Sequence, residues 1–562
     1  MFSIVKLFVL TVLFLKVSNT LIMRKVPAGL STYFRRLGDG RSGPGFRLQA
    51  SRKMSPRREG LGKPKGYSPN SEKLRYIVEP GSASGLPDKI GTGEPFLVMG
   101  IESSCDDTGV SIVRSTGEIL SNVVYSQHEI HEKFGGIVPS LAMNAHAQNI
   151  EIAVEEALKR ASLTSVDDVD AIAVTKGPGL EICLRIGCRK AQQLAIDHDK
   201  PFVTVHHLEA HCFTARMAGQ VVVDQDDIRS NGASSSFEVE IDGNRSSSAL
   251  MNFTPKVAFP FLTLLVSGGH TSLMICRGIG DYEVLGGTLD DSVGECFDKA
   301  ARLLGLRNAG SGGAAIEAAA LTSSDAKDRT ELRRRAKLIL KRMDQGDGSE
   351  ILEGEEKNII RDYRRKSPKK ACEMFSMKVP MREKKNCDFS YAGLKNSFRM
   401  AVDKARESEG LSVGGTNAPV NQMQPLDDSH VVSLSDGMAA DLCFHFQDIA
   451  FSHLEDRLGR ALDIIEEDAQ SRGENCTSLV VVGGVAANKE LRQRLLDLLE
   501  ERSRRDGADH LPLIFPPASL CTDNGAMVAW AGIEKLSVGI SDSPYGQEVI
   551  PRWPLGTLRK NK

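Results

Sequence analysis

Two histidines with a glutamate between them form the stretch of the chain best suited to metal chemistry. In VHHLEAH, residues 205–211, His207 and His211 are four residues apart and Glu209 lies between them. On a helix, such a pair shares one face and can bind one divalent metal ion. In the H-E-x-x-H motif of metalloproteases, the glutamate directly follows the first histidine. Glu209 is two positions on, roughly 200° around a helix, and should point away from the metal. The spacing predicts a metal site without protease chemistry.

A metal held by two histidines is usually completed by a carboxylate from elsewhere in the chain. The segment CTDNGAM, residues 521–527, offers Asp523 in a loop between apolar stretches. The spacing alone does not bring this loop to the histidines. His146 stands by itself in MNAHAQNI and is more typical of a polar core or surface histidine than of a ligand.

Glycine-rich turns after apolar runs form a second group of candidate sites. SGGHT at 267–271 and the glycine pair at 483–484 are both of this kind. Glycine lets backbone N–H groups approach a phosphate or carboxylate closely, although a tight turn without a ligand explains either turn taken alone. GPGL at 177–180 is more typical of structural packing. Asp298, within DDSVGECFDKAARLLGL, is either a solvated carboxylate or an acceptor for ribose hydroxyls.

The predicted elements show how these residues could be positioned. FLVMGIESSCDDTGVSIV (96–113) and FLTLLVSGGHTSLMIC (261–276) each predict a β-hairpin. SLVVVGGVAANKELRQRL (478–495) predicts a strand, a glycine turn and a helix that begins near Asn488. Helical patterns lie at 144–160, 185–196, 290–304 and 436–462. The repeated plan predicts a duplicated α/β fold with a nucleotide cleft between two lobes.

The chain joins two parts of opposite charge. Its net charge is −2, yet residues 1–75 hold 16 Lys and Arg against 3 Asp and Glu. Within this part, the apolar run at 7–15 is too short to span a bilayer. We expect residues 1–92 to be an organelle-targeting leader and disordered linker, for the mitochondrion or, through a bipartite leader, for a plastid. A basic tail without targeting function is the alternative. We expect no membrane association of the mature form.

The remaining sequence is long enough for more than one core. We expect a catalytic region at 93–555 and a basic tail at 556–562. Three polar stretches are predicted as surface insertions, near residues 221–257, 325–370 and 406–430. From 325 to 385 the chain holds 19 Lys and Arg against 12 Asp and Glu, enough to contact a polyanion, although a solvated charged helix explains the run as well. Eleven cysteines without a C-x-x-C pair indicate a reducing compartment.

Nine motifs together resemble one family. In chain order they are GIESSCDDTGVSI, GPGL, VHHLEAH, LLVSGGHTSL, GECFDKAARLLGL, DFSYAGLKNS, VVGGVAANKELR, CTDNGAM and PRWPL. Their order and approximate spacing are similar to those of the bacterial TsaD family and its organellar relatives, the tRNA N6-adenosine threonylcarbamoyltransferases. The resemblance covers roughly residues 96–555 apart from the insertions. It implies the actin-like ATPase fold (ASKHA, RNase H-like), in agreement with the duplicated α/β pattern.

The resemblance also implies roles for particular residues. It assigns one divalent metal per subunit, iron or zinc, to His207, His211 and Asp523. The implied substrate contacts are Leu265, Val266, Ser267, Gly268 and Gly269 for the phosphate and threonylcarbamoyl end, Asp298, Gly313 and Glu317 for the nucleoside, and Asn488 for the nucleotide pocket. No catalytic residue is assigned, and Asp106, Asp107 and His146 are candidates for a general base.

This chain departs from the family pattern at three places. After the LLGL helix it reads AGSGGAAIEAAA, without the proline of the family's G-G-P and with two extra residues. Before His146 it reads SLAMN where the family has E-L-A-S-R, so an arginine is missing. Asp107 stands where many members have glutamate, which shortens the side chain and keeps its charge.

The reaction implied by the resemblance moves a threonylcarbamoyl group from threonylcarbamoyl-AMP to N6 of adenosine 37 in tRNAs that read ANN codons. Position 37 lies in the anticodon loop, where a base can turn into a pocket without opening a duplex. Bacterial relatives work with partner proteins of this pathway and mitochondrial ones as homodimers, so either arrangement is open for this chain.

Three other functions fit the sequence less well. A metalloprotease would need a glutamate in a different register from Glu209. A sugar kinase of the actin-like group would not need two histidines and an aspartate as metal ligands. A non-catalytic paralogue of the pathway would be expected to have lost these ligands, and this chain retains all three.

Overall fold

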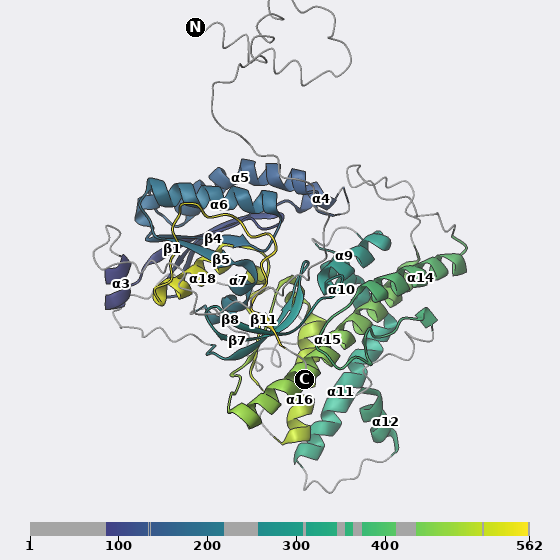
Figure 1. Cartoon of the computed structure of the whole chain (residues 1–562). Coiled ribbons are helices and arrows are strands. Elements are labelled where there is room, and N and C mark those ends of the chain that lie inside the picture. The colour runs from purple at the N-terminus through teal and green to yellow at the C-terminus, as the bar shows by residue number, and fades with distance from the viewer. Residues whose placement is uncertain are drawn as a thin grey trace, which may run out of the picture. The chain divides into compact units, whose positions relative to one another are not determined.

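The computed structural model describes residues 86–132, 134, 136–217, 257–306, 311–345, 354–363, 374–411, 434–507 and 511–559 (Figure 1). The chain divides into two compact units, residues 1–71 and 72–562, and every described residue belongs to the second. The predicted leader up to residue 85, nearly all of the insertion at 221–257 and most of that at 406–430 lie outside the described residues. No described helix has both the length and the apolar composition needed to cross a membrane.

The first sheet has five strands in the order β3-β2-β1-β4-β5. Strands β1, β2 and β3 are antiparallel neighbours, and β4 and β5 continue parallel to β1. The strands are β1 Leu97–Glu102, β2 Asp107–Arg114, β3 Ile119–Ser126, β4 Ala171–Gly177 and β5 Phe202–His206. The predicted hairpin at 96–113 is therefore confirmed.

Helices cover both faces of this sheet (Figure 1). Helices α5 (Pro139–Arg160) and α6 (Glu181–Asp197) pack on one face, and α18 (Gly525–Ser537) packs on the other beside α7 (His207–Phe213). Alternate strand residues supply the two cores, since Met99 packs with the first pair of helices and Val98 with α18. Smaller elements of this region are α3 Leu86–Thr92, α4 His128–Glu132, η1 Val166–Asp168 and η2 Thr214–Arg216.

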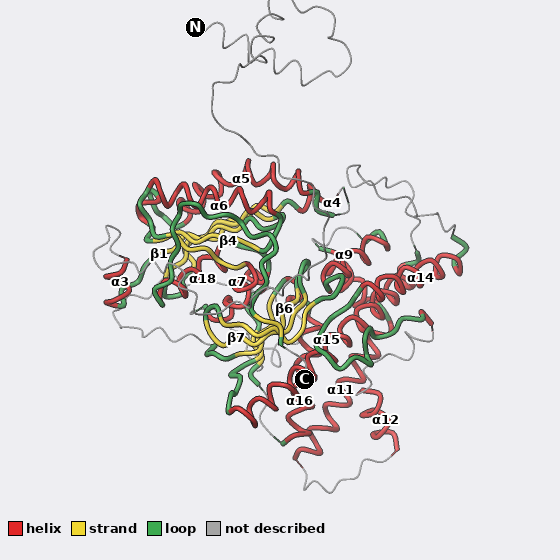
Figure 2. The backbone as a smooth tube through the Cα atoms, viewed as in Figure 1, coloured by secondary structure: helices red, strands yellow, loops and turns green. Residues whose placement is uncertain are grey.

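The second sheet repeats the plan of the first (Figure 2). Its order is β10-β9-β6-β7-β8-β11, so the five strands from β8 to β10 match those from β3 to β5 in order and direction. The strands are β6 Phe261–Val266, β7 Thr271–Gly278, β8 Asp281–Gly287, β9 Leu479–Val482, β10 Leu513–Ile514 and β11 Thr557–Leu558. This repetition confirms the predicted duplicated α/β fold with two lobes.

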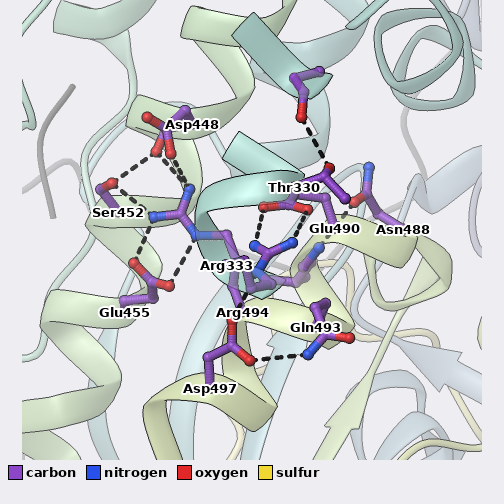
Figure 3. A network of polar contacts seen from close by, with 12 residues as sticks. Thr330, Arg333, Asp448, Ser452, Glu455, Asn488, Glu490, Gln493, Arg494 and Asp497 are labelled. Atoms are coloured by element: carbon purple, nitrogen blue, oxygen red, sulfur yellow. Dashed lines mark hydrogen bonds and ion pairs between the residues drawn. The ribbon is translucent and has the colours of Figure 1, made fainter. Parts of the chain in front are cut away.

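Helices of the second lobe bury one large core against this sheet. They are α9 Val293–Leu303, α10 Gly312–Thr322, α14 Ala392–Ser408, α15 Asp436–Arg472 and α16 Lys489–Asp506, with η4 Gly484–Ala487 and α17 Ala518–Cys521 at their edge. Within this lobe, α15 and α16 are joined by a buried cluster of charges. Arg494 of α16 forms hydrogen-bonded ion pairs with Asp448 and with Glu455 (2.6 Å), and donates to the Ser452 hydroxyl at 2.9 Å (Figure 3).

Within its described residues, the second predicted insertion forms the helices α11 (Ser324–Gln345) and α12 (Gly354–Tyr363). Arg333 of α11 lies 2.7 Å from Glu490 and 2.9 Å from Asp497, both on α16 (Figure 3). Lys337 lies 2.7 Å from Asp497. Two of the cations predicted to face a polyanion therefore attach α11 to α16 instead.

Candidate metal and substrate site

The helix that carries the two histidines is buried along its whole length. Strand β5 ends at His206 and α7 begins at the next residue. The His206 side chain accepts a hydrogen bond from the Leu208 N–H and lies 2.9 Å from the Trp553 carbonyl through Nε2. Because strands β1, β4 and β5 are parallel, their carboxyl ends meet at one sheet edge, and α7 begins there.

Asp523 is brought to this helix by a close approach of α18 to the sheet. A Cβ on Gly100 of β1 would lie 2.2 Å from the Gly525 carbonyl oxygen, and one on Gly525 would lie 2.5 Å from the Ser111 nitrogen. Only glycine at both positions allows this contact. Asn524 then caps α18 by accepting from the Met527 N–H, which fixes the loop that holds Asp523.

The three predicted ligands lie together. One ligand atom from each of His207, His211 and Asp523 falls within 4.8 Å of the others. Asp523 Oδ1 is 3.1 Å from Nε2 of His211 and 3.6 Å from Nε2 of His207. Two imidazoles and a carboxylate form a donor set that suits zinc or iron and leaves positions open for a substrate. The structure thus contains a group of residues that could hold a metal ion.

Glu102, at the end of β1, supports this site from behind. Its Oε2 lies 3.3 Å from Nδ1 of His207, and the carboxylate accepts from the Ser104 N–H and the Thr175 hydroxyl, each at 2.5 Å. A proton held on Nδ1 by Glu102 leaves Nε2 free to bind a metal, an arrangement common behind metal-bound histidines. The sequence analysis missed Glu102, although its place at the end of a predicted apolar strand was a usable signal.

The electrostatics of the site favour a cation. Burial opposes a charge on His207, but the carboxylates of Asp523 and Glu102 outweigh it and raise the pKa of this imidazole to about 9. Burial alone would raise the pKa of Asp523, yet His207 and His211 hold it well below its usual range. A metal ion bound through Nε2 would take the place of the proton on that nitrogen as the partner of Asp523, while Glu102 keeps the proton on Nδ1.

Glu209 points away from the ligands, as its register predicts. It accepts a hydrogen bond from the Tyr282 hydroxyl at 2.5 Å and lies 2.8 Å from Nζ of Lys535. The hydrogen bond ties α7 to β8 and the buried ion pair ties it to α18, so Glu209 is not positioned to activate a metal-bound water.

Glu102→Ala is expected to lower the affinity for a divalent metal by about 10- to 100-fold, because His207 loses the group that orients its ring. Titration of the metal-free protein with zinc, followed by calorimetry, measures the change. Glu118→Ala removes an exposed carboxylate paired with Arg114 and serves as the matched control. Equal zinc affinity in the two variants would contradict the role given to Glu102.

The glycine turn after β6 is open on one side and anchored on the other. No atom lies within 4 Å of where a Cβ would stand on Gly268 or Gly269. On the inner side, the Ser292 hydroxyl donates to the Gly268 carbonyl at 2.5 Å and the Gly294 N–H donates to the Ser267 carbonyl at 3.3 Å. Ser292 is also the N-cap of α9, so a helix N-terminus supports the turn. This arrangement suits an anion on the open side.

Gly294→Ala is expected to displace this turn, since its Cβ would lie 2.6 Å from the Ser267 carbonyl oxygen. We expect kcat/KM for the donor to fall at least about tenfold, because small misplacements of binding groups have large effects on rate. Gly437→Ala, on α15, meets no atom within 4 Å and provides the control. Unchanged kinetics with Gly294→Ala would argue against a substrate role for the turn.

The other predicted substrate residues differ in what they contact within the protein. Leu265 and Val266 are fully buried, so only their backbone is available to a ligand. Asp298 accepts from the Gly312 N–H at 3.1 Å, next to Gly313, where a Cβ would make only an ordinary contact, 3.9 Å from the Ser311 hydroxyl oxygen. Glu317 accepts from the Lys489 N–H at 2.8 Å.

The side chain of Asn488 forms hydrogen bonds within the protein through both its oxygen and its nitrogen. It caps α16 by accepting from the Leu491 N–H and donates to the Gln447 side chain at 3.0 Å. A nucleotide bound by Asn488, as predicted, would have to be contacted in addition to these two partners.

Two acidic residues and a histidine were named as candidate bases. Burial, together with the charges of Asp106 and Asp523, raises the pKa of Asp107 to about 7. His146 is fully buried, with Nδ1 2.7 Å from the Thr108 hydroxyl and Nε2 3.1 Å from the Cys105 carbonyl. Both nitrogens of His146 are therefore engaged, and Asp107 is the better placed of the two to exchange a proton near neutral pH.

Comparisons with known proteins agree with the motifs. The sequence profile of TsaD, tRNA N6-adenosine threonylcarbamoyltransferase, matches residues 118–224, 246–337 and 349–530. A relative from Arabidopsis thaliana, "Probable tRNA N6-adenosine threonylcarbamoyltransferase, mitochondrial", is 35% identical over 87% of this chain and 81% of its own length. A tRNA N6-adenosine threonylcarbamoyltransferase from Rhizobium etli (strain CIAT 652) is 34% identical over 82% of this chain and 95% of its own.

Likeness to solved structures is weak. Component A of (R)-2-hydroxyglutaryl-CoA dehydratase from Acidaminococcus fermentans aligns over 79% of this chain and 99% of its own, with 11% identity and a TM-score of 0.32. Function rests on the profile match, the two relatives and the nine motifs, and on these grounds the chain belongs to the TsaD family and is a tRNA N6-adenosine threonylcarbamoyltransferase.

Proposed function

We propose that this chain transfers the threonylcarbamoyl group from threonylcarbamoyl-AMP to N6 of adenosine 37 in tRNAs that read ANN codons, and releases AMP. The observation that carries the proposal is the group of His207, His211 and Asp523 within 4.8 Å, backed by Glu102. A chain of this family that had lost the chemistry would have no reason to keep these ligands and their support together.

The reaction forms a bond between N6 and the carbamoyl carbon and breaks the bond from that carbon to the phosphate oxygen. AMP leaves with the electron pair of the broken bond. A bound iron or zinc ion would supply Lewis acidity toward the donor's oxygens. The turn at 267–269 is proposed to hold the phosphate through the backbone N–H groups of Gly268 and Gly269, since the Ser267 N–H donates to the His270 carbonyl. Asp107 is proposed to receive the proton of the attacking amine, since its pKa of about 7 lets it act as a base at neutral pH.

Location and partners belong to the same proposal. The basic, acid-poor leader and the mitochondrial name of the Arabidopsis relative support import into the mitochondrion. A plastid remains the alternative. The chain is proposed to work as a homodimer or with other proteins of the pathway.

The experiment is a transfer assay with the full-length chain, a tRNA transcript that reads ANN codons, and threonylcarbamoyl-AMP. Mass spectrometry of the digested RNA quantifies the modified nucleoside, and released AMP is measured in parallel. We expect one AMP per modified adenosine, and no product from a transcript with guanosine at position 37. AMP release without modified RNA, or modification of the guanosine transcript, would overturn the proposal.

A further inference from the structure

The segment at residues 378–385, here named the basic loop, carries positive charge that no described residue neutralises. Lys378, Arg382, Lys384 and Lys385 are exposed, and Glu383 is the one acid of the loop. Within the described part of the chain, none of these four cations forms an ion pair or a side-chain hydrogen bond. Eight residues therefore present four cations and one anion to solvent.

The loop is held in place by its backbone. Arg457 of α15 is fully buried and donates to the Met381 and Asn386 carbonyls at 2.6 Å and to the Lys384 carbonyl at 2.9 Å. Arg460 donates to the Arg382 carbonyl at 3.2 Å. Because the carbonyls face α15, the loop keeps its shape while the charged side chains face outward. A fixed loop loses little conformational freedom when it binds a partner.

Apolar residues on both sides strengthen this anchoring. Phe375 and Met377 precede the loop, Cys387 and Phe389 follow it, and all four are buried in the core of the second lobe. The basic loop is thus short, highly charged and attached at both ends to the core of the second lobe.

The basic helix α11 differs from this loop. Arg333 and Lys337 pair with acids of α16, and the more exposed Arg334 and Arg335 lie 2.6 Å from Glu331 and 2.5 Å from Glu355. The predicted polyanion-binding stretch at 325–385 therefore separates into a helix whose charges are largely paired and a loop whose charges are not.

The chain that follows the basic loop is attached close to the support of the substrate turn. After the loop, the Ser390 hydroxyl donates to Asp290 at 2.5 Å, and the Tyr391 N–H donates to the same carboxylate at 2.7 Å. Asp290 lies two residues before Ser292, which binds the Gly268 carbonyl. The chain that follows the basic loop is therefore attached two residues before the serine that supports the turn.

We propose that the basic loop binds phosphates of the tRNA backbone and helps to place the anticodon loop at the site. This inference rests on the proposed function. Lysine and arginine contacts with phosphates supply affinity and register without sequence specificity, and each contact makes binding more sensitive to salt. Such a surface resolves the difficulty that a chain with a net charge of −2 must bind a polyanion.

The test compares two variants with the same change of charge. One replaces Lys378, Arg382, Lys384 and Lys385 by glutamine, and the control replaces the exposed α11 residues Arg334, Arg335, Lys341 and Arg342 by glutamine. Fluorescence anisotropy measures the Kd for labelled tRNA at several salt concentrations, and the transfer assay gives kcat and KM for tRNA. Vesicles of anionic phospholipid serve as a second polyanion.

We expect the loop variant to raise Kd and KM for tRNA at least tenfold, to flatten the salt dependence by about one unit of slope per lost contact, and to keep kcat at saturating tRNA. The control should change Kd less than twofold. An unchanged Kd in the loop variant, or equal weakening in both variants, would overturn the proposal. Loss of vesicle binding with intact tRNA binding would assign the loop to a membrane surface instead. Wild-type protein that binds tRNA through this loop yet transfers nothing would refute the proposed function alone.

Discussion

Asp523→Asn is expected to abolish tight binding of one metal ion per chain and to lower kcat/KM for tRNA modification by a factor of about 100 or more. The amide has the shape of the carboxylate but not its charge, so the site loses an anionic ligand that lies 3.1 Å from His211. Metal content by mass spectrometry and the transfer assay measure the two effects.

The fold should survive this change, because Asn524 and the contact between Gly100 and Gly525 hold the loop in place. Circular dichroism and the melting temperature check this point. Asp281→Asn, at an exposed position of β8, is the matched control and should leave metal content and activity intact. An Asp523→Asn protein with full activity and no metal would contradict the role assigned to this site.

Arg494→Met is expected to have the largest effect on stability, lowering the free energy of unfolding by about 3–5 kcal/mol. The reason is that Asp448 and Glu455 stay behind in the interior between α15 and α16 without their cation (Figure 3). Urea denaturation followed by circular dichroism measures the loss. Arg334→Met, which breaks an exposed pair with Glu331, should change the free energy by no more than about 0.5 kcal/mol.

A variant that also neutralises the two acids separates the effect of the lost cation from the effect of altered packing around residue 494. Arg494→Met combined with Asp448→Asn and Glu455→Gln removes all three charges and should recover part of the lost stability. If the triple variant is as unstable as the sum of the single changes, the cost arises from packing around Arg494 and not from buried charge.

Local patterns predicted the elements of the fold but not all their ends. The helix expected at 144–160 begins at Pro139, since proline suits the first turn of a helix. The apolar pattern used for the prediction starts only later in the helix. The helix expected at 436–462 continues to Arg472 and ends only at Gly473, which adopts the left-handed conformation with φ 68°. Two apolar runs separated by a polar turn were enough to predict both hairpins.

Part of the site could likewise be predicted from local sequence, and part depends on contacts between distant segments. The pairing of His207 with His211 follows from their spacing on one helix. That Asp523 joins them depends on two glycines, Gly100 and Gly525, that let α18 approach β1, and no local pattern shows this approach. The motif resemblance supplied Asp523, and the structure explains why it lies there.

Charge was the least predictable property. The composition of residues 325–385 is basic, but composition does not tell which cations meet acids of α16 and which face solvent. Arg333 and Arg382 are both arginines of this stretch, yet the first is paired with Glu490 and Asp497 and the second is exposed in the basic loop. The packing of α11 beside α16 brings Arg333 to its two acidic partners, and the sequence does not show this packing.

The most direct test of the central claim is the rate of threonylcarbamoyl transfer by the full-length chain before and after metal removal. Protein treated with a chelator would receive tRNA and threonylcarbamoyl-AMP, with or without one equivalent of iron or zinc. Transfer that is lost with the metal and restored by one equivalent, in wild type but not in Asp523→Asn, is the predicted result. Undiminished transfer by the metal-free protein would contradict the account of His207, His211 and Asp523 as the metal site that serves this reaction.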